Sequence, residues 1–485
     1  MTKHLSDLDA DSLLDPQDWD LFRQQAHDAL DVALDHIWQR QQGPVWRELP
    51  ESLKSTDAPL PCEGESIPVL VNELSEHVLP YTLGNTHPRF WGWVNGSGSP
   101  VNVVSQMLLG AINANMGGRD HAPIYLERQV LRWMQALFGM PSGASGMICT
   151  GTSTATLLGL AAARQRAIGP QIREKGNSAS PGLRIYASRE AHVSVTKAVE
   201  LLGMGSQVLR QIPVGGNFSM DTAALEQNII EDIQSGLQPF AVVSSVGSVN
   251  TGAIDDLPII NRLCREYGIW HHVDGAFGAL CMLSDKLKHR LAGIEQADSI
   301  AFDFHKWMHV NYAAGCLLVA DGELHRQSFE TSHAYLQGER QGMAGGAPWP
   351  HDFGVELSRG FTALGVWFQL RSTGVRRLGE AIHRNCLQAA ELGRVIEVAP
   401  ELELLAPVSL NIVCFRYRSE RPLAELNQLN RRIVIELQCR GIAAPSFTEF
   451  DGCVAIRVAL TNHRTRWRDL QALIEQTIAL GQELG

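Results

Sequence analysis

The sequence predicts an α/β protein, and two observations lead to that class. Through the middle of the chain, short apolar runs alternate with longer segments of helical character. Such alternation is typical of strand–helix units, which build a mostly parallel sheet covered by helices. After about Thr373 the pattern changes to long helices with a few strands between them. We therefore expect a large α/β domain followed by a small α+β domain.

Seven segments of the middle region are predicted strands, because each is a short apolar run. They are Gly146–Cys149, Ile185–Ala187, Val208–Ile212, Ala241–Val246, Ile269–Val273, Ser299–Phe302 and Cys316–Ala320. The helices predicted between them are Thr154–Ile168, Ala223–Ile233, Pro258–Tyr267 and Asp285–Gly293.

The two ends of the chain complete a three-part division into residues 1–85, 86–370 and 371–485. An amphipathic helix is predicted over Asp18–Gln41, and the proline-rich, polar segment Gln42–Ser66 is expected to be a linker or an extended arm. The C-terminal part is expected to hold helices over Val375–Val398 and Leu423–Cys439, strands near Leu404 and over Ile412–Tyr417 and Val454–Ala459, and a closing helix.

Composition narrows the functional classes. The chain of 485 residues has a net charge of −11, with 52 acidic and 41 basic residues, which argues against nucleic acid or an anionic membrane as a partner. Its nine cysteines are scattered without metal-ligand spacing, so we expect reduced thiols and no metal site. The N-terminus lacks an apolar stretch, and the apolar run Val101–Ala114 is broken by Asn, Ser and Gln. We expect a cytoplasmic protein.

A candidate anion-binding turn follows the first predicted strand of the middle region. Thr150-Gly151-Thr152-Ser153 runs directly into a helix, where backbone N–H groups, hydroxyls and the helix dipole favour an anion. Serine and threonine are also ordinary helix caps, so the turn alone does not establish a phosphate site.

Two further strand ends hold an acid and an amine. Asp274 ends an apolar run, and a buried carboxylate there needs a cationic partner, although a salt bridge or a cap would satisfy it equally. Lys306 follows another apolar strand and stands between His305 and Trp307. Desolvation lowers the pKa of a lysine and makes its amine nucleophilic, as Schiff-base chemistry requires, whereas a lone lysine is usually a surface charge.

His192, in the run Ser188-Arg189-Glu190-Ala191-His192, also follows a strand; its imidazole suits stacking on a flat ring or capping a helix. The anion turn, His192, Asp274 and Lys306 all come at strand ends, where open α/β sheets bind ligands. Asp274 and Lys306 are 32 residues apart, which fits one helix–strand unit, so the two are expected to be neighbours. Chance assembly of all four is improbable.

From about Leu74 to Thr465 the sequence resembles the group II amino-acid decarboxylases that depend on pyridoxal phosphate (PLP), which include aromatic-amino-acid, histidine and glutamate decarboxylases. The motifs are THPRFWGWVNG, TGTSTATL, REAHVSV, SVGSVNTGAIDD, WHHVDGAFG, DFHKW and SLNIVCFRY. The resemblance implies PLP fold type I and a homodimer with active sites at the subunit interface.

The resemblance also implies roles for single residues. Lys306 looks like the Schiff-base lysine, Asp274 like the partner of the pyridinium nitrogen, and His192 like the stacking imidazole. Roles in binding cofactor or substrate are implied for Gly151, Thr152 and Ser153 (phosphate), Ala276 (ring), Ser248 (cofactor), His305 (phosphate or substrate) and Trp93 (substrate pocket).

Three departures from the family pattern bear on the reaction outcome. The catalytic loop, residues 337–354, contains no tyrosine; Trp349 and Pro350 stand near its expected place, and Tyr335 lies too far upstream. Gly117 replaces a phenylalanine of the aromatic-substrate enzymes, which implies a roomier or a more polar pocket, in which Arg119 could meet an acidic side chain. Val249 replaces a threonine, with Ser248 and Asn250 near enough to compensate, and Asp303 replaces an asparagine.

The expected function is decarboxylation of an L-amino acid to an amine and CO2. Two alternatives remain at this point. One is decarboxylation with oxygen-dependent deamination to an aldehyde, a course that relatives without the loop tyrosine can take. The other is a non-catalytic homologue. Aromatic, acidic and small polar amino acids all remain open as substrates.

Overall fold

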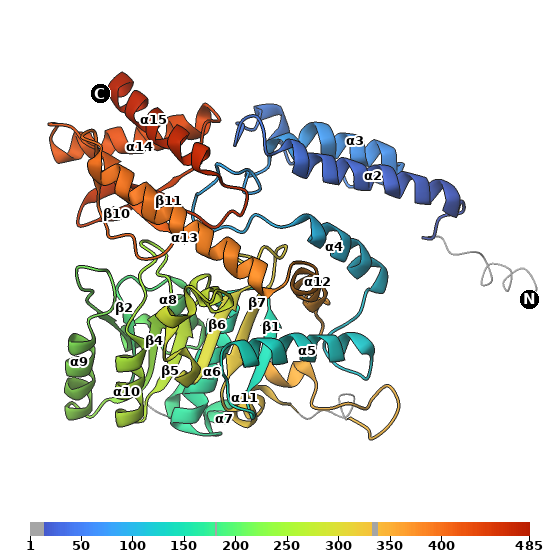
Figure 1. Cartoon of the computed structure of the whole chain (residues 1–485). Helices are drawn as coiled ribbons and strands as arrows, with labels where there is room; N and C mark the ends of the chain where they lie inside the picture. The colour runs from blue at the N-terminus through green and yellow to red at the C-terminus, as the bar shows by residue number, and fades with distance from the viewer. Residues whose placement is uncertain (1–13, 180–181, 332–337) are drawn as a thin grey trace, which may run out of the picture.

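A seven-stranded sheet forms the centre of the protein, which we describe from a computed structural model covering residues 14–179, 182–331 and 338–485 (Figure 1). The strand order is β1-β7-β6-β5-β4-β2-β3. The bounds are β1 Ser145–Cys149, β2 Leu183–Ser188, β3 Leu209–Ile212, β4 Gln238–Ser245, β5 Trp270–Asp274, β6 Ser299–Asp303 and β7 Gly315–Val319. All seven predicted strands are confirmed within one or two residues at most ends.

The sheet is parallel except at β7, which runs antiparallel to both β1 and β6. Parallel pairing joins β3 to β2, β2 to β4, β4 to β5 and β5 to β6. Strands β5, β6 and β7 are buried at every residue, which is why their sequences read as continuous apolar runs rather than alternating ones. The mostly parallel sheet is confirmed.

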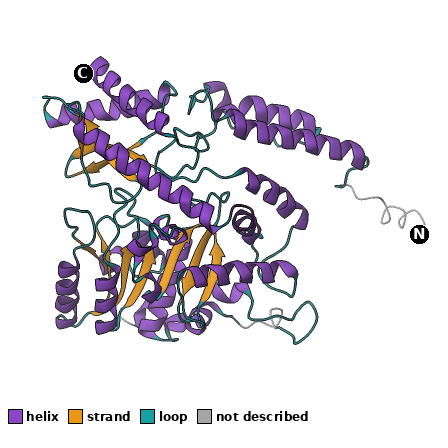
Figure 2. Cartoon of the chain, viewed as in Figure 1, coloured by secondary structure: helices purple, strands orange, loops and turns teal. Residues whose placement is uncertain are grey.

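Helices cover both faces of the sheet (Figure 2). Helix α6 (Thr152–Ile168) leaves β1 through the candidate anion turn and packs across β4 to β7. Most of its residues are buried, so it shows little amphipathic character. The other helices of this region are α4 Pro100–Ile112, α5 Ala122–Leu137, α7 Ile172–Lys175, α8 Ser194–Leu201, α9 Thr222–Gln234, α10 Leu257–Tyr267, α11 Gly322–Phe329 and α12 Ala363–Thr373.

The C-terminal part packs three helices against a four-stranded sheet of order β10-β11-β9-β8. Its elements are α13 Val375–Val398, β8 Leu402–Leu404, β9 Ile412–Tyr417, α14 Leu423–Cys439, β10 Ser446–Phe450, β11 Cys453–Ala459 and α15 Trp467–Leu484. Strand β10 was not predicted. It is an edge strand whose middle three residues are exposed or half-buried, so it lacks an apolar run.

Two helices at the N-terminus, α2 (Trp19–Gln39) and α3 (Ile67–His77), lie side by side and project from the body (Figure 1). Neither contains a buried residue. Helix α3 was not predicted as a separate element. Across the described ranges, no helix has both the length and the apolar character that crossing a bilayer requires.

One predicted helix is wrong. Residues Asp285–Gly293 form turns and the 3-10 helix Lys288–Leu291 instead of an α-helix. Gly293 adopts a left-handed φ of 97°, which ends any regular helix at that residue. The division of the chain at residues 85 and 370 stays a prediction.

Candidate active site

One cavity brings together every site residue predicted from the sequence. Its volume is about 320 Å³, within the range of small-molecule sites. It opens at the carboxyl ends of β1, β2, β4, β5 and β6, where an open α/β sheet is expected to bind its ligand. The predicted residues that line it are Trp93, Gly151, Thr152, Ser153, His192, Ser248, Asp274, Ala276, His305 and Lys306.

The amine of Lys306 is held in the cavity by a carboxylate. Its Nζ lies 3.0 Å from Oδ2 of Asp303, a residue only 2% exposed at the end of β6. The other oxygen of Asp303 accepts a hydrogen bond of 2.7 Å from the backbone N–H of Thr152. Asp303 thus joins the lysine turn to the first residue of α6.

Asp274 ends the neighbouring strand β5 and is 6% exposed. Burial raises the pKa of its carboxyl group, and the charges of Lys306 and His192 oppose that rise. Its Oδ1 accepts a hydrogen bond of 3.1 Å from the N–H of Ala276. A buried carboxylate of this kind is stabilised by a cation placed in the cavity.

The imidazole of His192 lines the cavity from the loop after β2. Its Nδ1 lies 2.8 Å from Oγ of Ser194 and accepts the backbone N–H of Ser194 at 3.2 Å. These bonds fix the orientation of the ring and place its proton on Nε2. Burial lowers the pKa of His192, so the ring is neutral at physiological pH.

His305 is packed between the cavity and Tyr312. The two ring centroids are 4.4 Å apart, and burial lowers the pKa of His305. The hydroxyl of Tyr312 donates to Oδ1 of Asn95 and accepts the N–H of Gly96, both at 3.1 Å. A Cβ at Gly96 would lie 1.6 Å from the carbonyl oxygen of His305, so only glycine allows this close approach.

Sequence reasoning missed Arg457, which is 3% exposed on β11. Its guanidinium donates to the carbonyl oxygens of Trp93 at 2.9 Å, of Asn250 at 3.1 Å and of Val249. Arg457 therefore ties together two loops that line the cavity. Nothing in the apolar alternation of its strand indicated this, because the partners lie more than 200 residues away.

The anion turn has the features that a phosphate group requires. Oγ1 of Thr152 is buried without a hydrogen-bond partner, and Gly151 presents bare backbone to the cavity. A Cβ at Gly315 would lie 2.5 Å from Cα of Gly151, so β7 closes on the turn without leaving room for a side chain. Together with the Asp274 carboxylate and the flat face of His192, these residues fit pyridoxal phosphate.

The departures from the family pattern have structural counterparts. The described part of the catalytic loop, from residue 338 onward, holds Trp349, which is 2% exposed and donates its indole N–H to the carbonyl of Gly345 at 2.9 Å. This side chain is fixed inside the loop and does not line the cavity. Tyr335 lies outside the described residues.

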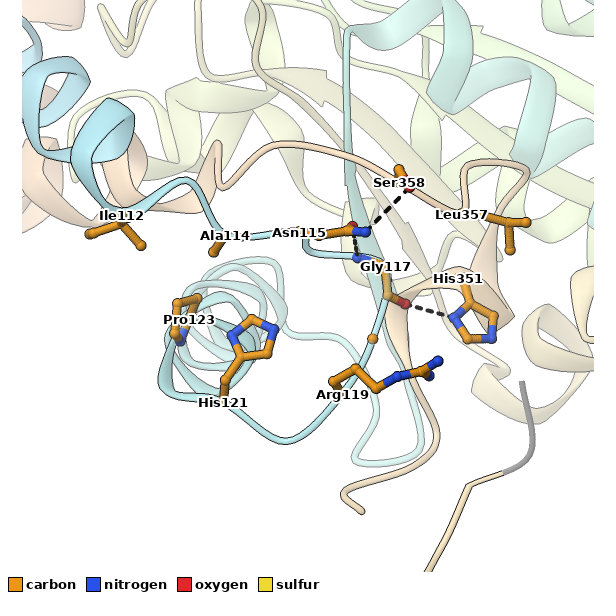
Figure 3. Close-up of a pocket in the computed structure, with 11 residues that line it drawn as sticks. Ile112, Ala114, Asn115, Gly117, Arg119, His121, Pro123, His351, Leu357 and Ser358 are labelled. Atoms are coloured by element: carbon orange, nitrogen blue, oxygen red, sulfur yellow. Dashed lines mark hydrogen bonds between the residues drawn. The ribbon is translucent and has the colours of Figure 1, made fainter. Parts of the chain in front are cut away.

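Gly117 lines a larger cavity of about 670 Å³, shown in Figure 3. Its carbonyl accepts a 2.7 Å hydrogen bond from Nδ1 of His351, and a Cβ at this position would lie 1.8 Å from the carbonyl oxygen of Leu357. The backbone packing excludes a phenylalanine here. Arg119 lines the same cavity, and its guanidinium carbon Cζ lies 4.8 Å from the ring centroid of Trp349.

Comparison with known proteins gives a consistent result. The sequence model described as "Pyridoxal-dependent decarboxylase conserved domain" matches residues 50–418. The chain is 30% identical over 471 residues to aromatic-L-amino-acid decarboxylase of Bacillus atrophaeus, covering 95% of this chain and 96% of that protein. It is 27% identical to phenylacetaldehyde synthase of Petunia hybrida, covering 93% and 91%.

The fold is similar to that of Oryza sativa TDC, solved with PLP and tryptamine, with a TM-score of 0.89, 25% identity and coverage of 97% of this chain and 99% of that chain. PLP fold type I is therefore confirmed. The chain belongs to the family of pyridoxal-dependent decarboxylases, and it is a PLP-dependent amino-acid decarboxylase.

Proposed function

We propose that the protein removes the α-carboxyl group of an L-amino acid to give an amine and CO2, with the cofactor aldehyde covalently joined to the amine of Lys306. The observation that supports this most directly is the shared cavity, in which Lys306, Asp274 and His192 converge from three strand ends. A non-catalytic homologue would have no need to keep these three groups together in one cavity.

Each residue has a defined task in this proposal. The Asp274 carboxylate keeps a proton on the ring nitrogen of the cofactor, and the His192 imidazole packs on the ring face. Thr152 and Ser153 bind the phosphate group. When bound, PLP supplies an electron sink that accepts the electron pair left by the departing carboxylate. A proton must then reach Cα.

A second outcome, conversion of the amino acid to an aldehyde, is favoured by one observation. The loop expected to supply the acid for Cα has no tyrosine, and the indole N–H of Trp349 is already bonded within the loop. The balanced reaction consumes O2 and water, and releases the aldehyde, CO2, ammonia and hydrogen peroxide in equal amounts.

The decisive experiment is a screen of the common amino acids, with diaminobutyrate and cysteine sulfinate, for CO2 release in air. We expect one amine per CO2 from the accepted substrate. Aldehyde and peroxide formed in equal amount to CO2 would replace amine formation with the second outcome. A purified protein that stays colourless on addition of PLP, and releases no CO2 from any amino acid, would contradict both.

We also propose that the active form is a homodimer. Helices α2 and α3 bury no residue, and α4 exposes Val104, Met107, Leu108 and Ile112 on one side. Exposed apolar side chains grouped along one helix are typical of a subunit interface. Light scattering should give twice the mass of the chain, and Met107→Glu should lower it to one chain. Leu201→Glu, a change of equal kind at an exposed leucine of α8, should leave the dimer intact.

A cytoplasmic location completes the proposal. It is supported by the nine cysteines, all of which are free thiols, since disulfides are rare in that compartment. Cell fractionation should find the protein with cytoplasmic markers, and recovery with membranes or in a secreted fraction would contradict it.

A further inference from the structure

A separate cavity of about 500 Å³ lies near the turn that follows Lys306, between the start of α4, helices α12 and α13, and the loop after β11. Its polar lining includes Ser99, His309, Gln369, Arg377, Arg384 and His463. None of these residues lines the candidate active site. The backbone N–H of His309 donates to the carbonyl of Lys306 at 3.3 Å, so the cavity and the catalytic lysine share one turn.

Two histidines in this cavity share a single hydroxyl group. Oγ of Ser97 lies 3.2 Å from Nδ1 of His309 and 3.0 Å from Nδ1 of His463, and the two ring centroids are 4.4 Å apart. The hydroxyl has one proton, so it donates to one ring and accepts from the other. The ring that accepts must have its own proton on Nε2. The pair therefore has one Nε2–H donor and one bare Nε2 acceptor, and the donor belongs to His309 when Ser97 donates to that ring.

His309 is 3% exposed, and its Nε2 has no hydrogen-bond partner. Burial and the charges of Arg464 and Arg384 lower the pKa of both imidazoles, to about 3 for His309 and about 2 for His463. The two rings are consequently neutral, and an unsatisfied polar nitrogen remains in a buried position. Such a group is costly unless a ligand satisfies it.

Three arginines around the histidine pair lack a carboxylate partner. Among the described residues, Arg377, Arg384 and Arg464 form no ion pair; Arg384 donates to the carbonyl of His463, and Arg464 donates to that of Ser97 at 3.1 Å. Burial lowers the pKa of Arg464 to about 10, yet it stays charged. Glu380 is the single carboxylate in the lining.

Helix α4 adds to this positive potential. The N-cap residue Ser99 and the first two helical residues, Pro100 and Val101, line the cavity, and the Ser99 hydroxyl donates to Oε1 of Gln369 at 2.6 Å instead of capping the helix. The dipole of a helix of this length favours an anion at its N-terminus. The helix end and the arginines favour an anion, and so does Nε2 of His309 in the tautomer in which Ser97 donates to that ring.

We propose that this cavity binds a small oxyanion, the carboxylate or phosphate group of a metabolite, through Arg377, Arg384 and the histidine pair. The site is distinct from the cofactor turn and lies against the segment that holds the catalytic lysine. The proposal does not depend on which amino acid the enzyme accepts or on which product it releases.

The test uses the PLP-loaded protein, so that the cofactor phosphate already fills the turn at Thr152. Sulfate, inorganic phosphate and citrate are titrated at constant ionic strength, and binding is followed by calorimetry and by the thermal unfolding midpoint. We expect saturable binding of at least one anion with a matching rise of the midpoint. Preference for citrate would indicate a carboxylate ligand, and preference for phosphate or sulfate a phosphate group.

Arg377→Gln is the informative variant, because Arg377 lines the cavity and is an exposed residue, so its loss should leave the fold intact. It should weaken binding at least tenfold, with unchanged circular dichroism. Arg376→Gln removes the same charge from an exposed neighbour outside the cavity and should bind within twofold of the original protein. Equal loss in both variants, undiminished binding to Arg377→Gln, or the absence of saturable binding for all three anions would overturn the proposal.

Discussion

The carboxylate of Asp303 lies 3.0 Å from the amine of Lys306 while it accepts the N–H of Thr152 at 2.7 Å. One buried acid therefore occupies a donor of the turn that fits the cofactor phosphate, and it also holds the amine that fits the cofactor aldehyde. The negative charge of Asp303 next to this turn therefore opposes the binding of an anionic phosphate group.

Asp303→Asn should tighten PLP binding. The amide removes a negative charge from the phosphate turn, and its oxygen can still accept the N–H of Thr152. We expect the dissociation constant for PLP to fall about fivefold, the equivalent of roughly 1 kcal/mol. Titration of the cofactor-free protein by visible absorbance measures it. Asp285→Asn, at an exposed carboxylate, should show no change, and weaker binding to Asp303→Asn would contradict this account.

Lys306→Ala should abolish covalent attachment of the cofactor. Borohydride reduction followed by mass spectrometry should find PLP on a peptide containing Lys306 in the original protein and nowhere in the variant. Lys288→Ala, at a half-exposed lysine outside the cavity, should keep the modification. Reducible PLP that persists in Lys306→Ala would assign the amine to another residue.

Asp274→Asn should bind PLP and turn over slowly. The amide has the size of the carboxylate but cannot hold a proton on the ring nitrogen, so the electron sink weakens. We expect kcat to fall on the order of a hundredfold, a loss of about 2.7 kcal/mol in the barrier. The cofactor absorbance should remain. A rate within threefold of the original enzyme would show that another group protonates the ring.

The neighbourhood of Asp274 and Lys306 could be predicted from the sequence because both stand at the ends of apolar strands. Their spacing of 32 residues fits one connection from the end of a strand to the end of the next parallel strand, and β5 and β6 are indeed adjacent. The element between them is a series of turns rather than the predicted helix. The predicted adjacency of the two strands was confirmed although the predicted helix between them was wrong. Parallel pairing constrains where the strands end, and it does not constrain the path of the chain between them.

Contacts between the C-terminal part of the chain and the segments around residues 93–97 could not be predicted. Arg457 reaches the carbonyl of Trp93 from a position 364 residues away, and Ser97 meets His463 across 366 residues. Such pairs depend on how the C-terminal sheet packs on the large one. The spacing of apolar residues indicates which face of a strand is buried, but not which other segment packs against it. A buried arginine within a strand therefore gives no indication of its partners.

Tyr312→Phe should separate a positioning role from an acid role. The variant keeps the ring that packs on His305 but loses the hydroxyl that bonds Asn95 and Gly96, next to the cavity wall at Trp93 and Val94. We expect KM to rise severalfold while kcat stays within about twofold. Burial raises the pKa of this hydroxyl, so it stays protonated at neutral pH. A hundredfold fall in kcat, with aldehyde replacing amine, would instead identify Tyr312 as the acid that protonates Cα.

Stability should fall steeply below pH 6.5, because several histidines are held neutral in the fold. Burial lowers the pKa to about 2 for His463, about 3 for His271, His272 and His309, and about 4 for His87 and His325. On unfolding, each returns to a pKa near 6.5 and takes up a proton. The unfolded state then binds more protons than the folded state, so stability is lost as pH falls through 6.5, by up to about 1.4 kcal/mol per pH unit for each ring.

The carboxyl group of Asp255 has the opposite effect on stability, because it stabilises the folded state as pH falls, over a narrower pH range. Burial raises its pKa to about 6, so between that value and the ordinary value near 4 the folded state holds the extra proton. Burial also raises the pKa of Asp274 and of Asp298, which act in the same direction as Asp255. Three carboxyl groups do not offset six imidazoles, and the urea midpoint should therefore drop between pH 7.5 and 5.5. His272→Asn should flatten this dependence, whereas His289→Asn, at an exposed ring, should not. A midpoint that is the same at both pH values would show that the buried rings are already protonated in the folded state.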